Sequence, residues 1–268
     1  MHLRTTITGA VLLTIALRSQ PQAGESERLT FEVASVKPSP PGTRGGIIRV
    51  MPGNQRYHCE NMTLRTIMTV AYPVTERLIS GGPGWLETDG YDIEAKASRP
   101  RTDDELNVML QNLLADRFQL RLRHEKREEA AYVLTVDKHG SKMPTHDAED
   151  KDYPPIGGDV LRATDGSICP GLAGRNVTMH YFAFVLSRML DLQVVDRTGL
   201  PARYDLTVHY APDDGGLRSG LGGVGQTYTP DCDGVYSALP AQLGLRLEKG
   251  RGIVEHLVVE HAGNPTEN

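Results

Sequence analysis

Two segments of this chain repeat one another in the same order and at nearly the same spacing. Residues 61–64 (Asn-Met-Thr-Leu) resemble residues 176–179 (Asn-Val-Thr-Met), and residues 91–93 (Tyr-Asp-Ile) resemble residues 204–206 (Tyr-Asp-Leu). The two motifs begin 30 positions apart in the first case and 28 positions apart in the second. Because an internal repeat constrains the whole architecture, it predicts a chain built from two related halves.

Each half has the pattern of helices followed by strands. Thr63 and Thr178 fit helix N-caps, where a hydroxyl accepts a hydrogen bond from an unpaired backbone N–H, and apolar residues recur at helical spacing after each. Thr102 and Glu105 have the spacing of a capping box. Helix–strand–strand units are expected near residues 62–97, 103–137, 177–210 and 235–261. The pattern predicts an α+β fold, two related halves of repeated α-β-β units with mainly antiparallel sheets.

Within these units the strand patterns predict hairpins. Leu120 and Leu122 alternate with polar residues, and residues 132–136 continue as a second strand. Near the C-terminus, residues 245–247 alternate in the same way and residues 254–259 form the last strand. An opening strand is expected at residues 31–35.

Proline and glycine mark the expected boundaries between these parts. The first half is expected over residues 24–139 and the second over residues 173–268. Residues 140–172 are rich in proline and glycine, which predicts a linker or a long loop. Residues 213–234 form a Gly-rich insertion in the second half.

The N-terminus has the features of a secretory signal peptide over residues 1–23. Arg4 precedes about eleven mostly apolar residues, a run too short to cross a bilayer, which takes roughly 20 residues as a helix. We expect cleavage after Ala23, export to the periplasm or the exterior, and no membrane span in the mature chain. The alternatives are an uncleaved anchor and a buried N-terminal helix.

The chain has three cysteines, so at least one of them stays outside any intramolecular disulfide. In an oxidising compartment one disulfide is plausible, and the pair Cys169 and Cys232 is preferred because both residues lie in loop-like stretches. Three free thiols remain the alternative. No Cys-x-x-Cys pair suggests a zinc or redox site.

Charge and motifs argue against several classes of function. A formal net charge of −5 does not fit a nucleic-acid protein, which usually carries a basic surplus. Residues 220–225 satisfy G-x-G-x-x-G, but Pro230 prevents the helix that a dinucleotide site needs, so a surface loop is expected. His139, His146 and Asp147 are the only candidates for a metal site, and solvent-facing histidines are the commoner case. No cofactor and no metal are therefore expected.

The expected ligand site contains aromatic residues. Residues 80–84 are rich in glycine and place Trp85, the only tryptophan, before the strand that begins at Tyr91. A cleft between the halves, near Trp85, Tyr91 and Tyr204, is the predicted site, although Trp85 also fits a residue that fills the core under a tight turn.

The sequence leaves three possible functions. The first is a non-catalytic module that binds an unidentified ligand or protein of the cell envelope. The second is an envelope hydrolase that uses Asp92 or Asp205 with a strand histidine, and an acid–histidine pair about 3 Å apart in a pocket would favour it. The third is a structural partner that docks by strand addition, which residues 254–259 at a sheet edge would favour.

The chain resembles a family of exported bacterial proteins known as the soil-associated family, abundant in acidobacterial genomes. The matching segments are residues 31–38, 61–66, 79–85, 91–96, 113–118, 195–200 and 242–245. That family has no known function, so the resemblance supplies no catalytic residue. Its domain is also found appended to zinc peptidases of the antibiotic-sensing type, which implies a sensory or binding role outside the membrane. This chain lacks the peptidase segment and the His-Glu-x-x-His motif.

Overall fold

The computed structural model describes five stretches of the chain, residues 28–51, 55–146, 156–190, 192–211 and 232–265. The expected signal peptide, Asp147, the G-x-G-x-x-G motif and most of the Gly-rich insertion lie outside the described residues. In the part of the chain that is described, no helix combines the length and the apolar composition needed to cross a bilayer.

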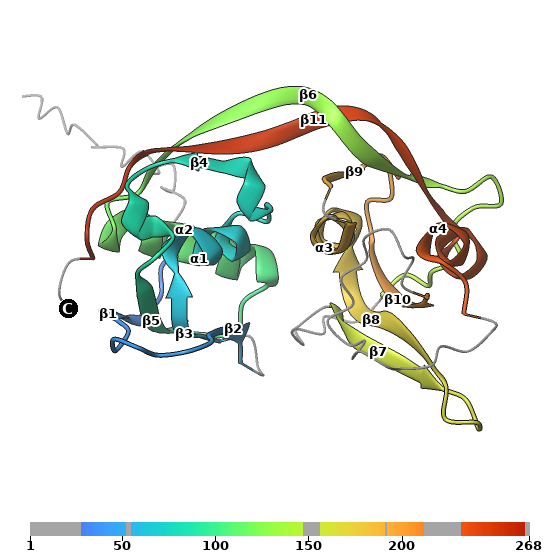
Figure 1. Ribbon diagram of the computed structural model, residues 1–268, viewed down its shortest axis with the longest axis horizontal. Helices are drawn as coiled ribbons and strands as arrows, with labels where there is room; N and C mark the ends of the chain where they lie inside the picture. Colours follow the sequence, from blue (N-terminus) through green and yellow to red (C-terminus); the bar gives the residue numbers. More distant parts are fainter. Residues whose placement is uncertain (1–27, 52–54, 147–155, 191, 212–231, 266–268) are drawn as a thin grey trace, which may run out of the picture.

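The first lobe is a four-stranded antiparallel sheet with two helices packed against it (Figure 1). Its strands, in spatial order, are β1 (Val33–Pro38), β5 (Gly90–Lys96), β3 (Arg56–Thr63) and β2 (Ile47–Val50). Its helices are α1 (Leu64–Ala71) and α2 (Asp103–Arg117), whose apolar residues share one core with the sheet.

The second lobe has a smaller sheet of the same kind (Figure 1). Its antiparallel strands, in order, are β10 (Arg203–His209), β8 (Ile168–Thr178) and β7 (Ile156–Arg162). Helix α3 (Met179–Leu190), the single turn α4 (Val235–Ala238) and the π-helical turn η3 (Leu239–Leu243) pack against it. The region 140–172, expected to be a linker or loop, thus contains β7 and the start of β8 among its described residues.

A long two-stranded ribbon arches over both lobes (Figure 1). It consists of β6 (Arg121–Val136) and β11 (Leu245–His261), which are antiparallel over almost their whole length. Short strands extend the ribbon at opposite ends: β4 (Ile79–Gly81) runs parallel to β11, and β9 (Val194–Asp196) runs parallel to β6. Two 3-10 turns, η1 (Glu76–Leu78) and η2 (Gly84–Leu86), flank β4.

The two predicted hairpins are wrong, because β6 and β11 are each one continuous strand. The charged residues between Leu122 and Tyr132 have the composition of a loop. They can form a strand because the middle of the ribbon is exposed, so their side chains stay in solvent. Polar side chains pair across the two strands, such as His124 with Glu255 at 2.7 Å and His256 with Glu129 at 3.0 Å.

The C-terminal end of β11 does not lie at a sheet edge. Residues 257–259 of β11 lie between β4 and β6. Residues 254–256 pair with β6 alone, so the edge position that would favour docking by strand addition holds for the first half of the predicted segment and not for the second.

The α+β class and the mainly antiparallel sheets are confirmed. Buried apolar residues form two large clusters, one in each lobe, and the ribbon contributes to both. A third, small cluster of Leu78, Ala131 and Val254 lies under the middle of the ribbon.

The helix caps expected from the sequence are present. The Thr63 and Thr178 hydroxyls accept hydrogen bonds from backbone N–H groups three residues on, at 3.3 and 3.2 Å. Thr102 and Glu105 form the capping box, and Gly244 ends η3 in the left-handed conformation, with φ of 66°. These local signals depend only on neighbouring residues, which is why the sequence reveals them.

The two repeated motifs build similar junctions between a strand and a helix. Asn61 and Asn176 both have positive φ, 46° and 58°, which is uncommon for residues other than glycine and enriched in asparagine. The N–H of Asn61 donates to Asp92 Oδ1 at 2.8 Å, and that of Asn176 donates to Asp205 Oδ1 at 2.9 Å. The geometry of the two junctions therefore matches, while the repeat of whole units stays a prediction.

Candidate functional site

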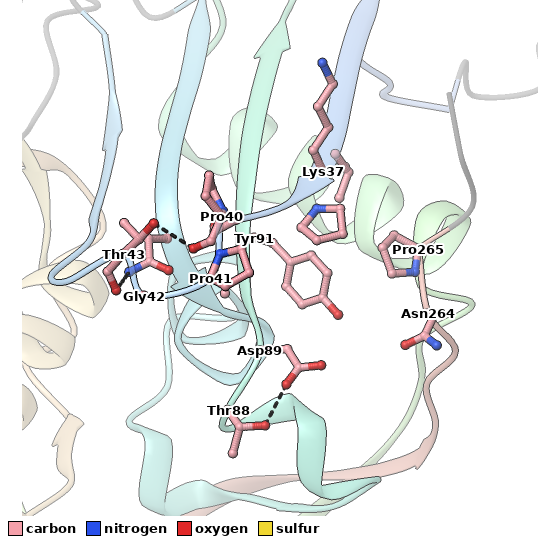
Figure 2. Close-up of a pocket in the computed structure, with 15 residues that line it drawn as sticks. Lys37, Pro40, Pro41, Gly42, Thr43, Thr88, Asp89, Tyr91, Asn264 and Pro265 are labelled. Carbon is pink, nitrogen blue, oxygen red and sulfur yellow. Dashed lines mark hydrogen bonds between the residues drawn. The ribbon is translucent and has the colours of Figure 1, made fainter.

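A groove of about 1010 Å³ opens at one end of the first sheet (Figure 2). Its walls come from the end of β1 and the loop after it, residues 37–43, from the start of β5, residues 88–91, and from the segment that follows β11, residues 264–265. A volume of this size is at the upper end of the range for small-molecule sites.

Tyr91 forms the floor of the groove. It is only 3% exposed, and its ring contacts Phe118 edge-on at 5.0 Å and Trp85 at 6.2 Å between ring centroids. Its hydroxyl points into the open space between Asp89 and Asn264 (Figure 2). No described residue forms a hydrogen bond with this hydroxyl, so a buried ring presents an unpaired polar group to the groove.

The groove places a hydrogen-bond donor beside an acceptor. Burial raises the pKa of the Tyr91 hydroxyl, and the nearby charge of Asp89 raises it further, so the hydroxyl stays protonated and can donate. The Asp89 carboxylate accepts a hydrogen bond from Thr88 Oγ1 at 2.7 Å on one oxygen. Its other oxygen is available to a donor on a ligand.

The loop that forms the proline wall is fixed by side chains from the sheet. Asp92 Oδ1 accepts from Ser39 Oγ at 2.6 Å and from the Asn61 N–H at 2.8 Å. The Asn61 amide then donates to the carbonyl oxygens of Thr43 and Gly45 at 3.1 and 2.6 Å. One carboxylate and one amide therefore hold the wall before any ligand binds, which lowers the entropy cost of binding.

Glycine is required where β5 passes the side chain of Asn61. A Cβ atom on Gly90 would lie 2.3 Å from Asn61 Oδ1, closer than real contacts allow. A larger residue at position 90 would displace the amide that holds the loop, so the floor and the wall of the groove are coupled through this contact.

Prolines supply much of the apolar part of the remaining lining. Pro40 and Pro41 line one side, Pro265 lines the other, and the Lys37 side chain extends past the rim (Figure 2). Such a groove can hold a small molecule by packing its apolar part on the pyrrolidine rings while Tyr91 and Asp89 fix its polar part.

The structure brings together only two of the three predicted ligand residues. Trp85 contacts Tyr91 and stacks on Phe118 at 6.3 Å, in the role of a residue that fills the core, and it does not line the groove. Tyr204, 5% exposed, lies in the core of the second lobe. A cleft does lie between the lobes, as described below, but none of the three aromatic residues lines it.

Acid–histidine pairs occur both inside and outside the described pockets. His124 Nδ1 lies 2.7 Å from Glu255 Oε1, and both residues line a cavity of about 770 Å³. His146 Nδ1 lies 2.8 Å from Asp205 Oδ1, and the His146 side chain is 3% exposed, with Nε2 buried and unpaired. Burial tends to raise the pKa of Asp205, but the hydrogen bonds from Asn176 and His146 outweigh it and lower the pKa below its usual value. Asp92 pairs with Ser39 rather than with a histidine. His146 and Asp205 line none of the three described pockets, whereas the strand pair His124 and Glu255 meets the condition set for a hydrolase, an acid and a histidine about 3 Å apart in a pocket.

No group of three or more metal-ligating side chains occurs among the described residues. Cys169 and Cys232 form a disulfide with their Cα atoms 5.6 Å apart. Cys59 is a buried free thiol, and burial together with the charge of Asp92 raises its pKa to about 12. A thiol held protonated in this way is a poor nucleophile.

Sequence reasoning missed the proline wall and the C-terminal segment of the groove. The run Pro40-Pro41-Gly42 directly after the opening strand is a signal that could have drawn attention to the wall. Asn264 and Pro265 reach the groove only because β11 returns from the far lobe, and no local pattern indicates that.

Comparison with known proteins places the chain by family. The family described as "Protein of unknown function (DUF3738)" matches residues 65–262, most of the chain. No curated protein and no solved structure gives a significant match. Because this match covers most of its length, the chain belongs to the DUF3738 family of proteins of unknown function.

Proposed function

We propose that this protein is an exported, non-catalytic binding protein of the cell envelope, with its ligand site in the groove of Figure 2. The observation that carries the proposal is the Tyr91 hydroxyl, which projects from a buried ring into the groove and has no partner among the described residues. An unpaired polar group next to a cavity is the kind of group that a ligand satisfies.

The chemistry of the floor favours a ligand that contains an amide. The protonated Tyr91 hydroxyl donates to a carbonyl oxygen, and the Asp89 carboxylate accepts from an N–H. A single amide supplies both partners side by side. Because prolines form the walls, an apolar substituent next to this amide gains contact area there.

Two features support export. Residues 7–17 have the length and composition of a secretory signal. The disulfide between Cys169 and Cys232 fits an oxidising compartment, since disulfides are rare in reducing ones. Mass spectrometry of the protein from the envelope fraction tests this point: we expect a mature chain that begins after Ala23, and an intact N-terminus in the cytosol would contradict export.

Ligands are found by thermal unfolding of the purified protein against a panel. The panel contains peptidoglycan fragments, short peptides, β-lactams, neutral sugars and divalent metals. A ligand at one hundred times its dissociation constant adds about 2.7 kcal/mol of stability. We expect amide-containing compounds to raise the melting temperature.

Two matched variants show whether such a ligand uses the groove. Tyr91→Phe removes the hydroxyl and keeps the ring that packs on Phe118. Tyr204→Phe removes the same group from the strand in the second lobe, away from the groove. The proposal requires the shift to shrink in the first variant only, and an equal shift in both would reject the groove as the site.

A further inference from the structure

The β6–β11 ribbon arches over both lobes (Figure 1). A second cavity, of about 770 Å³, is lined on one side by the segment that follows α1, residues 72–74, and by α2, and on the other by the start of α3 and by residues 193–196, which include β9. The ribbon forms its roof. We call this cavity the inter-lobe cleft, and it shares no lining residue with the groove of Figure 2.

An unpaired acceptor is buried in the wall of the inter-lobe cleft. Gln193 Oε1 has no hydrogen-bond partner and no solvent contact, although its own amide nitrogen donates to the Val194 carbonyl at 3.4 Å. A buried carbonyl without a donor lowers stability, and a folded protein rarely keeps one without a compensating role. Because the Gln193 side chain lines the cleft, a rotation of its amide would bring this oxygen to a donor on a bound ligand.

Two more amides present acceptors to the inter-lobe cleft in a fixed orientation. The Gln111 nitrogen donates to the Ala71 carbonyl at 2.7 Å, and the Asn112 nitrogen donates to the Leu29 carbonyl at 2.9 Å. Since a backbone carbonyl can only accept, the nitrogen of each amide must face it. The side-chain oxygens of both residues are left for other donors.

The inter-lobe cleft also holds donors that have no acceptor among the described residues. Burial raises the pKa of the Tyr72 hydroxyl, which keeps it protonated, and its ring contacts His124 edge-on at 6.3 Å. Lys126 on the ribbon and His180 at the start of α3 line the cleft without a hydrogen bond or ion pair within the described part of the chain. Residues that carry acceptors and residues that carry donors thus line one volume.

We propose that the inter-lobe cleft binds a neutral oligosaccharide. Each sugar hydroxyl both donates and accepts, so a single class of group satisfies the amide oxygens and the Tyr72 and Lys126 donors together. The Tyr72 ring offers an apolar face for the C–H side of a sugar ring.

The test uses ligand-observed NMR and calorimetry on the purified protein. The probes are maltotriose, cellotriose and mannotriose, which carry no amide and therefore do not fit the proposal for the groove. We expect at least one of them to bind. Gln193→Leu keeps the volume of the side chain and removes its acceptor, and Tyr72→Phe keeps the ring and removes the donor.

We expect each of these variants to weaken binding by about tenfold, while Tyr91→Phe, in the groove, binds as the unaltered protein does. The Gln193→Leu protein should also unfold at a higher temperature, so its weaker binding cannot be ascribed to misfolding. Absence of binding by all three trisaccharides would overturn the proposal. Binding that Gln193→Leu and Tyr72→Phe leave unchanged, or that Tyr91→Phe abolishes, would overturn it as well.

Discussion

Removal of the carboxylate at either strand–helix junction should destabilise the protein by a similar amount. Asp92 accepts from Ser39 Oγ at 2.6 Å and from the Asn61 N–H at 2.8 Å. Asp205 accepts from His146 Nδ1 at 2.8 Å and from the Asn176 N–H at 2.9 Å. Each carboxylate therefore satisfies one side chain and one backbone N–H.

The size of the effect follows from those two bonds. A hydrogen bond to a charged group contributes about 1.5–3 kcal/mol, and a buried donor left unpaired costs about 1–3 kcal/mol. Because both sites are partly exposed, water can replace some of the lost hydrogen bonds. We therefore expect Asp92→Ala and Asp205→Ala each to lower the free energy of unfolding by about 2–4 kcal/mol. Every kcal/mol corresponds to about 2–4 °C of melting temperature in a domain of this size.

The assay is urea unfolding followed by circular dichroism, with Asp116→Ala as the matched control. Asp116 also makes two hydrogen bonds, to Arg28 at 3.1 and 2.8 Å, but both partners are exposed. Exposed pairs contribute about 0–1 kcal/mol. If Asp92→Ala and Asp205→Ala cost no more than this control, the junctions do not support the structure as argued.

Three further expectations concern stability. Gln193→Leu removes a buried unpaired carbonyl and should raise the free energy of unfolding by about 1–3 kcal/mol in urea titration, and a loss would show that the oxygen has a partner. Reduction of the disulfide between Cys169 and Cys232, 63 positions apart, should cost about 2–5 kcal/mol, and an unchanged melting temperature in reductant would contradict it. The N–H of Thr102 lowers the pKa of Glu105 in the folded state, so this carboxylate contributes stability above its unfolded pKa of about 4.3 that is lost as the pH falls through its folded pKa. The Glu105→Gln variant should therefore lose less stability between pH 5 and pH 3 than the unaltered protein does.

Local chemistry made the helix starts predictable from the sequence. The N-caps at Thr63 and Thr178 and the capping box at Thr102 depend on residues no more than a turn away. The α+β class followed from the alternation of helical and strand periods. The left-handed asparagines were not predicted, because φ at Asn61 is set by a carboxylate 31 positions later in the chain.

The ribbon could not be predicted from the sequence. The charged residues of β6 have no apolar alternation, so their strand is visible only when β11, more than a hundred positions away, pairs with them. The prediction of hairpins failed for that reason. Tyr91 lines the groove of Figure 2, whereas Trp85 and Tyr204 pack in the two cores.

Contacts between distant parts of the chain also explain why the three aromatic residues do not meet at one cleft. The sequence placed all three aromatic residues at a cleft between the halves, but each lobe buries its own aromatic residues around its own sheet. At the end of the first sheet, where the Pro40 loop and the segment at Asn264 meet, the Tyr91 hydroxyl faces open space.

The most direct test of the proposed binding function is a calorimetric titration with the amide-containing compound that gives the largest thermal shift. The dissociation constant is measured for the unaltered protein, for Tyr91→Phe and for Tyr204→Phe. Loss of one hydrogen bond to a neutral group is worth about 0.5–1.5 kcal/mol, so Tyr91→Phe should weaken binding up to about tenfold, with Tyr204→Phe unchanged. Equal affinity in all three proteins would show that the groove is not the ligand site.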